Sequence, residues 1–135
     1  MNYLLDTNVL SEPAKPAPNP KLVRWLADHD PQVLISVLTL GEIVKGIELM
    51  PSGKRRRQME AWFEEIEQWA ADRLLPVDAE VMHVWGAYYA KQLRRGHALD
   101  VMDSLLAATA LAHGLTIASR NLADFPDVPV VNPLE

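Results

Sequence analysis

The stretch Tyr3-Leu4-Leu5-Asp6-Thr7-Asn8-Val9-Leu10 decides the fold class of this chain. Its apolar residues 3–5 predict a short buried strand, and the polar residues 6–8 lead from this strand into one turn of helix. A strand that passes into a helix is the first step of a βα unit. Repeated βα units form parallel sheets covered by helices.

The rest of the chain repeats this alternation of strands and helices. The apolar runs 33–37, 115–119 and 128–131 predict further strands, and Pro129 places the last of them at an edge. Helical spacing predicts helices that begin at Pro20, Thr39, Asp78 and Asp100, and a longer amphipathic helix through 59–70. The prolines after Glu12 predict an extended surface loop over Pro13–Asn19. We therefore expect an α/β fold, a short parallel sheet flanked by α-helices on both faces.

Length and composition narrow the class of protein. A chain of 135 residues suits a single domain, 1–135, with one core. A net charge of -5 argues against nonspecific nucleic-acid binding by the whole surface, but it leaves room for a local basic patch. The absence of cysteine excludes disulfides and thiolate metal sites. Because the chain has no long apolar stretch and no signal-peptide pattern, we expect a cytoplasmic protein without a membrane span.

Four acidic residues stand beside the apolar runs: Asp6, Glu42, Asp103 and Asp124. Asp103 stands at the front of the run 105–111, and we expect the acids to follow successive strands. Segments that leave the carboxyl ends of parallel strands converge on one crevice. Carboxylates gathered there resist ionisation, and a hard divalent cation such as Mg²⁺ or Mn²⁺ relieves their repulsion. This pattern predicts metal-assisted phosphodiester hydrolysis.

Several of these acids also have an ordinary structural explanation. Asp6 could cap the helix that follows it. Thr39-x-x-Glu42 has the spacing of a capping box, in which Glu42 reaches back to the Thr39 amide. Asp100-x-x-Asp103 places two acids at the start of one helix, and spacing alone leaves open which of them enters the crevice. The joint pattern carries the hypothesis, rather than any one residue.

Four motifs, in order, resemble the PIN-domain ribonucleases, and within them the VapC-type toxins of bacterial toxin–antitoxin pairs. They are Leu4-Leu5-Asp6-Thr7-Asn8-Val9-Leu10-Ser11-Glu12, Ser36-Val37-Leu38-Thr39-Leu40-Gly41-Glu42-Ile43, Asp103-Ser104-Leu105-Leu106-Ala107-Ala108-Thr109-Ala110 and Ser119-Arg120-Asn121-Leu122-Ala123-Asp124-Phe125. The Pro-rich loop after Glu12 resembles the FitB-type branch, and the resemblance spans nearly the whole chain. The chain departs from the family pattern at two positions. Ser119 stands where family members often have Thr, and Asp100 is an additional acid just ahead of Asp103.

The resemblance implies a PIN-like fold and a metal-dependent ribonuclease that acts as a toxin. It implies that the catalytic and metal-binding acids are Asp6, Glu42, Asp103 and Asp124. Of the two acids that spacing left open, it favours Asp103 over Asp100, and it makes Thr7 and Asn121 supporting residues of the pocket. It also implies Mg²⁺ (or Mn²⁺) as cofactor, an RNA substrate, a cognate antitoxin protein and a homodimer that forms a higher assembly with the antitoxin.

Basic and apolar residues suggest where partners bind. Arg120, beside the last motif, and Lys45, one turn beyond Glu42, are candidates for RNA contact. The basic runs 54–57 and 94–95 could also follow a phosphate backbone, or could be solvated helix ends. The apolar stripe from Met59 to Trp69 indicates core or a subunit interface. By the resemblance, an antitoxin helix would bind an apolar groove and place a basic side chain near the acids.

Two other functions stay open at this point. A catalytically inactive PIN-fold binding scaffold would keep the fold without cleaving RNA. An aspartyl-nucleophile phosphatase of the haloacid dehalogenase type would use Asp6 as its nucleophile. That chemistry needs a second Asp two residues later, where this chain has Asn8, and a Lys from a later strand that we cannot assign.

Overall fold

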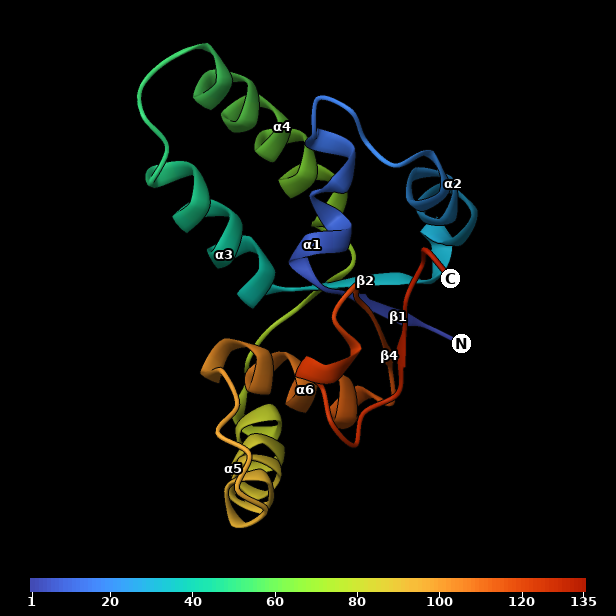
Figure 1. Cartoon of the computed structure of the whole chain (residues 1–135), viewed down its shortest axis with the longest axis vertical. Coiled ribbons are helices and arrows are strands. Elements are labelled where there is room, and N and C mark those ends of the chain that lie inside the picture. Colours follow the sequence, from blue (N-terminus) through green and yellow to red (C-terminus); the bar gives the residue numbers. More distant parts are fainter.

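The computed structural model describes residues 1–135 and contains a five-stranded parallel sheet between two groups of helices (Figure 1). The strands lie in the order β3-β2-β1-β4-β5, and every pair is parallel. They are β1 (Tyr3–Leu5), β2 (Val33–Ser36), β3 (Leu74–Leu75), β4 (Thr116–Ala118) and β5 (Val130–Val131). The expected α/β class is confirmed, with β1 at the centre of the sheet.

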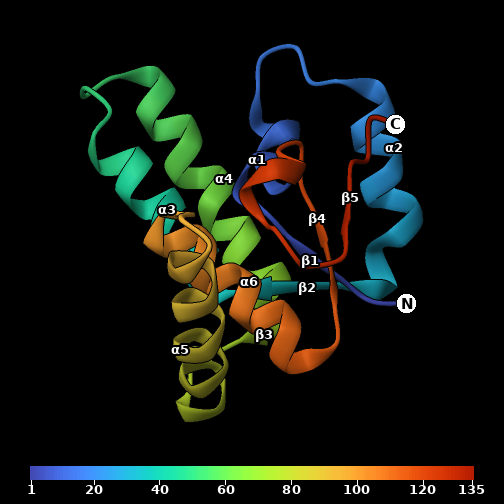
Figure 2. The ribbon, with the colours of Figure 1, turned by 60° about the horizontal axis from the view of Figure 1, so that its bottom comes forward.

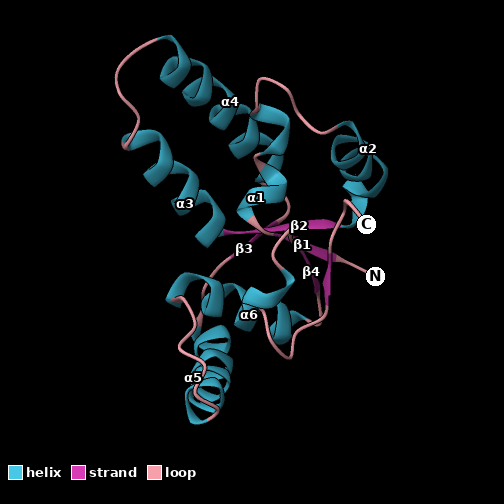
Figure 3. Cartoon of the chain, viewed as in Figure 1, coloured by secondary structure: helices cyan, strands magenta, loops and turns pink.

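Six α-helices connect the strands, and all of them except the short α1 are much longer than the strands (Figure 3). They are α1 (Thr7–Leu10), α2 (Pro20–His29), α3 (Val37–Glu48), α4 (Lys54–Ala70), α5 (Ala79–Arg94) and α6 (Val101–His113). Figures 1 and 2 show α1 to α4 on one side of the sheet and α5 and α6 on the other. No helix is both long enough and apolar enough to cross a membrane.

Alternate residues of each strand supply the two halves of the core, as the period of a β-strand requires. Leu5 belongs to the cluster under α1 to α4, whereas its neighbour Leu4 belongs to the cluster under α5 and α6. Ala118 and Ile117 of β4 divide in the same way. Both faces of the sheet are therefore covered, which is the arrangement that places the carboxyl ends of the strands at one open edge.

Three expectations about local structure are wrong. The strand β3 was not expected, because two residues are too few to show a period. The helix α3 begins at Val37 and not at Thr39, because the Ser36 hydroxyl accepts a hydrogen bond from the Leu38 amide and caps the helix three residues before Thr39. A capping box between Thr39 and Glu42 is therefore excluded. The expected loop over Pro13–Asn19 also contains part of a 3₁₀ turn, Glu12–Ala14.

Candidate metal and catalytic site

Asp6 lies at the carboxyl end of the central strand and is almost fully buried, with 8% of its surface exposed. Its backbone amide continues the pairing of β1 with β4 by donating to the Ala118 carbonyl at 2.9 Å. One carboxylate oxygen accepts from the Thr7 amide at 2.8 Å, and the other accepts from the Ser119 hydroxyl at 2.7 Å. Asp6 thus caps α1, as expected, and is also tied to the end of β4.

Glu42 lies in the second turn of α3 and faces α1. The Thr7 hydroxyl donates to Glu42 Oε1 at 3.2 Å, which joins two segments that are 35 residues apart in the chain. The pKa of Glu42 is raised, and burial is the largest cause. The hydrogen bond from Thr7 opposes this rise, whereas the negative charge of Asp6 adds to it. The structure therefore brings Thr7 and Glu42 together beside Asp6.

Asp103 reaches the same place from a helix and not from a strand. It lies in the first turn of α6, whose N-terminus Asp100 caps by accepting from the Asp103 amide at 3.0 Å. The expectation that every acid follows a strand is wrong here, because the run 105–111 is part of α6. Asp100 is thus a helix cap, while the Asp103 side chain is half-buried among the other acids.

The charges at this edge act strongly on one another. Burial is the largest cause that raises the pKa of Asp103 to about 7, and Asp100, Asp6, Asp124 and Glu42 each raise it further by charge repulsion. The pKa of Asp6 is also raised, chiefly by burial, against the hydrogen bonds from Ser119 and Thr7. Asp124, in the 3₁₀ turn Leu122–Asp124, adds to this rise. All four acids named from the sequence therefore belong to one electrostatic cluster.

The donor chemistry of this cluster fits a hard divalent cation. It offers only oxygen ligands, which Mg²⁺ and Mn²⁺ prefer. No three of the carboxylates come close enough together to enclose an ion in this structure. Mg²⁺ keeps several of its own waters and needs few protein ligands. Burial is the main cause of the raised pKa values, and a cation here would relieve the repulsion that adds to it; its waters could span the gaps between the carboxylates.

Arg120 and Lys45 lie beside the acids, but only Lys45 is free of an ion pair. Arg120 donates to Glu12 Oε1 at 2.9 Å, and its amide donates to Asn8 Oδ1 at 3.4 Å. Lys45 is exposed, and its charge lowers the pKa of Glu42. Asn121 is also exposed, and its amide donates to the Ser119 hydroxyl at 3.0 Å.

Sequence reasoning missed the roles of two buried residues. Glu12 is 3% exposed and accepts hydrogen bonds from the side chains of Lys15 and Arg120, so it ties the Pro-rich segment to the turn after β4. Ser119 is fully buried and joins Asp6 to that same turn. The motifs contain both residues. The only local sign of this role in the sequence is that Glu12 directly precedes Pro13.

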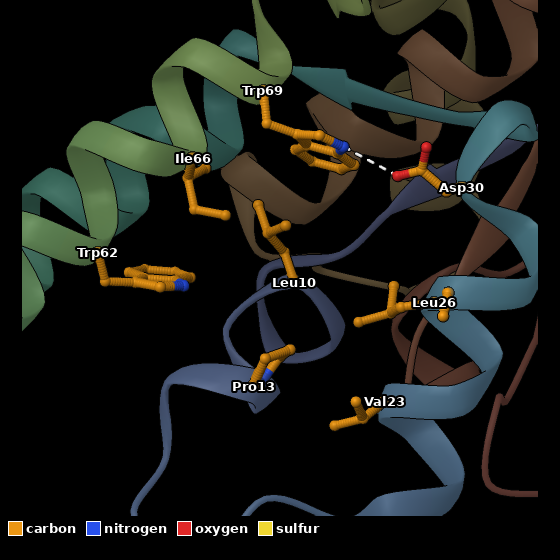
Figure 4. A pocket seen from close by; sticks show the side chains of 9 residues that line it. Leu10, Pro13, Val23, Leu26, Asp30, Trp62, Ile66 and Trp69 are labelled. Atoms are coloured by element: carbon orange, nitrogen blue, oxygen red, sulfur yellow. Dashed lines mark hydrogen bonds between the residues drawn. The ribbon is translucent and has the colours of Figure 1, made fainter.

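An apolar groove lies between α2 and α4, next to α1 (Figure 4). Its cavity of about 330 Å³ is lined by Leu10, Pro13, Val23, Leu26, Ala27, Asp30, Trp62, Ile66 and Trp69. The Trp69 indole donates to Asp30 Oδ1 at 2.9 Å, which fixes one end of the groove. The stripe from Met59 to Trp69 packs against the core, and part of it lines this groove.

Comparison with known proteins identifies the class. Residues 3–130 match the PIN domain family, and the chain belongs to that family. It is similar to Toxin FitB of Neisseria gonorrhoeae, with 36% identity over 96% of each chain. It is also similar to VapC ribonuclease Y4jK of Sinorhizobium fredii, with 32% identity over 98% of this chain and 97% of the relative. The crystal structure of FitAcB from Neisseria gonorrhoeae has a TM-score of 0.90, 35% identity, and covers 98% of this chain and 99% of that one. These findings leave the phosphatase alternative without support.

Proposed function

We propose that this chain is a metal-dependent ribonuclease and acts as the toxin of a toxin–antitoxin pair. The observation that carries the proposal is the cluster of Asp6, Glu42, Asp103 and Asp124 at one sheet edge, where the pKa of Asp103 rises to about 7. Relatives that include Toxin FitB and VapC ribonuclease Y4jK support the same activity. A site that destabilises its own ionised acids is typical of metal and catalytic centres.

The residues of the site divide into metal ligands and supporting residues in this proposal. Asp6, Glu42, Asp103 and Asp124 would hold Mg²⁺ or Mn²⁺. A bound cation lowers the pKa of a water and neutralises charge that develops on the scissile phosphate. Ser119 fixes the orientation of Asp6 and Thr7 that of Glu42, so these two carboxylates cannot rotate away from the crevice. Asn121, which is exposed and whose backbone amide donates to the Ser119 hydroxyl, would be a supporting polar residue.

RNA would approach over the positive side chains beside the acids. Lys45 is exposed, unpaired and one turn from Glu42, so it can meet a phosphate without breaking an ion pair. Arg120 is held by buried Glu12, and its guanidinium retains further N–H groups for a phosphate. A net charge of -5 means that these few cations, rather than the whole surface, attract the substrate.

The apolar groove of Figure 4 would receive the antitoxin. Its walls of aromatic and aliphatic side chains suit the apolar face of an amphipathic helix. The groove shares Trp62 with a second cavity that Thr7 and Glu42 also line, so a bound segment can extend toward the acids. A basic side chain there would occupy the position of the cation. A homodimer is part of the same proposal, because Val37 and Val44 of α3 are exposed apolar residues.

The test is cleavage of RNA by the purified chain with Mg²⁺ or Mn²⁺. We expect cleavage that EDTA stops and that Asp6→Asn or Asp103→Asn abolishes. If the folded, metal-supplied protein cleaves no RNA from its own host while a cognate antitoxin still binds it, the chain is the inactive scaffold. Size-exclusion chromatography with light scattering tests the homodimer in the same preparation.

A further inference from the structure

Helix α5 clamps the segment that follows Asp124. Asp127 Oδ2 accepts a hydrogen bond from Gln92 Nε2 at 2.9 Å and pairs with Lys91, both from the last turns of α5, and with the C-cap residue Arg95. One residue earlier, the Pro126 carbonyl accepts from the Tyr88 hydroxyl at 2.7 Å. Four side chains, from the second half of α5 and from its C-cap Arg95, therefore hold two consecutive residues, and Asp127 stands three positions beyond a proposed metal ligand.

Tyr88 and Gln92 are the buried members of this clamp, and Gln92 is the one that holds Asp127 itself. Lys91 and Arg95 are about half-exposed, and ion pairs at that exposure contribute little. Gln92 is fully buried, and both ends of its amide are used: Nε2 donates to Asp127, and Oε1 lies 3.0 Å from His97 Nδ1. A buried amide is costly unless each polar atom has a partner, so the Asp127 contact is part of a complete network.

The backbone at Asp127 shows that the clamp holds an unfavourable conformation. Its φ of 64° is in the left-handed region, and no other non-glycine residue of the chain has a positive φ. Asp enters this region at a modest energetic cost, and such conformations persist where surrounding contacts enforce them. The turn at Asp127 directs the chain from Asp124 into the edge strand β5.

Asp124 depends on this segment for its position. Ser119 and Thr7 orient the carboxylates of Asp6 and Glu42 by hydrogen bonds, whereas the Asp124 carboxylate has no such partner. Its place is therefore set by the backbone of the turn. That backbone is anchored on one side by Ser119, and on the other by buried Phe125 and the clamp at Asp127.

We propose that Asp127, held by Gln92, is a positioning residue that fixes the Asp124 carboxylate at the metal site. The inference rests on the proposed function, because it needs Asp124 to be a ligand. It adds that α5, on the far side of the sheet from Glu42, controls how well the site is formed. Mutation of a residue that orients a metal ligand typically weakens metal binding by about tenfold or more.

The test is direct Mn²⁺ binding, measured by electron paramagnetic resonance, for the wild type and for Asp127→Gly and Asp127→Asn. Gly and Asn both accept a positive φ, so neither variant strains the turn. Asp127→Gly removes the acceptor, and we expect its Mn²⁺ dissociation constant to rise about tenfold. We also expect its kcat on RNA to fall while KM stays nearly constant. Asp127→Asn keeps an oxygen for Gln92, and we expect it to recover most of the affinity.

Asp78→Ala is the matched control, because it removes the N-terminal cap of the same helix, where the Asp78 side chain accepts from the Val81 amide at 3.0 Å. It should lower the melting temperature without changing Mn²⁺ affinity. An equal loss of affinity in Asp78→Ala and Asp127→Gly would overturn the inference, since the effect would then follow stability alone. Wild-type affinity in Asp127→Gly would overturn it while leaving the proposed function intact. A wild-type protein that binds no Mn²⁺ would overturn both.

Discussion

Replacing Asp103 with Asn should stabilise the metal-free protein at alkaline pH while it abolishes RNA cleavage. Burial and the neighbouring carboxylates raise the pKa of Asp103 from 3.8 to about 7. Between these values the folded protein holds a proton that the unfolded chain has released. The free energy of unfolding therefore falls as the pH rises through this window toward 7. The amide side chain of the Asp103→Asn variant cannot ionise, so the variant escapes this loss.

The magnitude follows from the width of the window. Two pH units, from about 5 to about 7, correspond to about 2.7 kcal/mol. Asp103 is only half-buried, and solvent screening reduces this to about 1–2 kcal/mol. The lost attraction between a carboxylate and the N-terminus of α6 opposes the gain by about 0.5 kcal/mol. We therefore expect the stability advantage of Asp103→Asn over the wild type to grow by about 1–2 kcal/mol between pH 5 and pH 8.

Urea unfolding in EDTA at pH 5 and pH 8 measures this advantage, and the slope with urea should be the same for both proteins. The control is Asp28→Asn, an exposed acid of α2, whose effect should not change between the two pH values. Excess Mn²⁺ should reverse the order at pH 8, because only the wild type gains stability from binding it. An Asp103→Asn variant whose advantage is the same at pH 5 and pH 8 would refute the crowding of acids on which the site depends.

Three further substitutions test separate parts of the account. Ser119→Ala should lower the free energy of unfolding at pH 8 by about 1–3 kcal/mol, because buried Asp6 loses a hydrogen-bond donor; urea unfolding measures this. Glu12→Gln should lower the melting temperature at neutral pH, because hydrogen bonds and charges from Lys15, Asn19 and Arg120 lower the pKa of Glu12. That contribution is present above pH 4.5 and is lost as the pH falls through the lowered pKa, so melting curves of the two proteins should converge in acid. Val23→Glu should weaken antitoxin binding by about tenfold or more, measured by calorimetry, because it places a charge in the apolar groove.

Each of these substitutions has a control on the same chain. Ser52→Ala changes an exposed serine and should leave stability unchanged. Glu64→Gln changes an exposed acid of α4, and its effect on melting should not depend on the pH. Met82→Glu adds the same charge at an exposed position of α5 and should keep antitoxin affinity. Val23→Glu should also keep RNA cleavage, and a parallel loss of cleavage would show that the groove is not a separate antitoxin surface.

Much of the fold could be predicted from the sequence because the central elements carry strong local signals. The run 3–5 with its polar turn, the cap at Asp78 and the cap at Asp100 all appear as expected. The two-residue strand β3 could not be predicted, since its pairing with Ile35 and Ser36 depends on tertiary contact. The start of α3 was misplaced because Ser36 and Thr39 have similar capping propensity, and only the structure shows which hydroxyl is used.

For the candidate site, the sequence indicated which acids would gather at one edge of the sheet but not what holds them. Asp6 and Glu42 were named from the strand–turn pattern, yet their hydrogen bonds to Ser119 and Thr7 join residues 113 and 35 positions apart. The clamp on Asp127 is equally nonlocal. Such contacts leave no periodic pattern, because they depend on how the sheet edge brings separate turns together.

The most direct test of the central claim is anomalous diffraction from a crystal of this chain soaked in Mn²⁺. We expect one or two manganese peaks at the carboxyl end of β1, bounded by the oxygens of Asp6, Asp103 and their neighbouring acids. Manganese peaks only elsewhere on the surface, or none with the acids intact and the crystal unharmed, would contradict the claim that these carboxylates form a metal site.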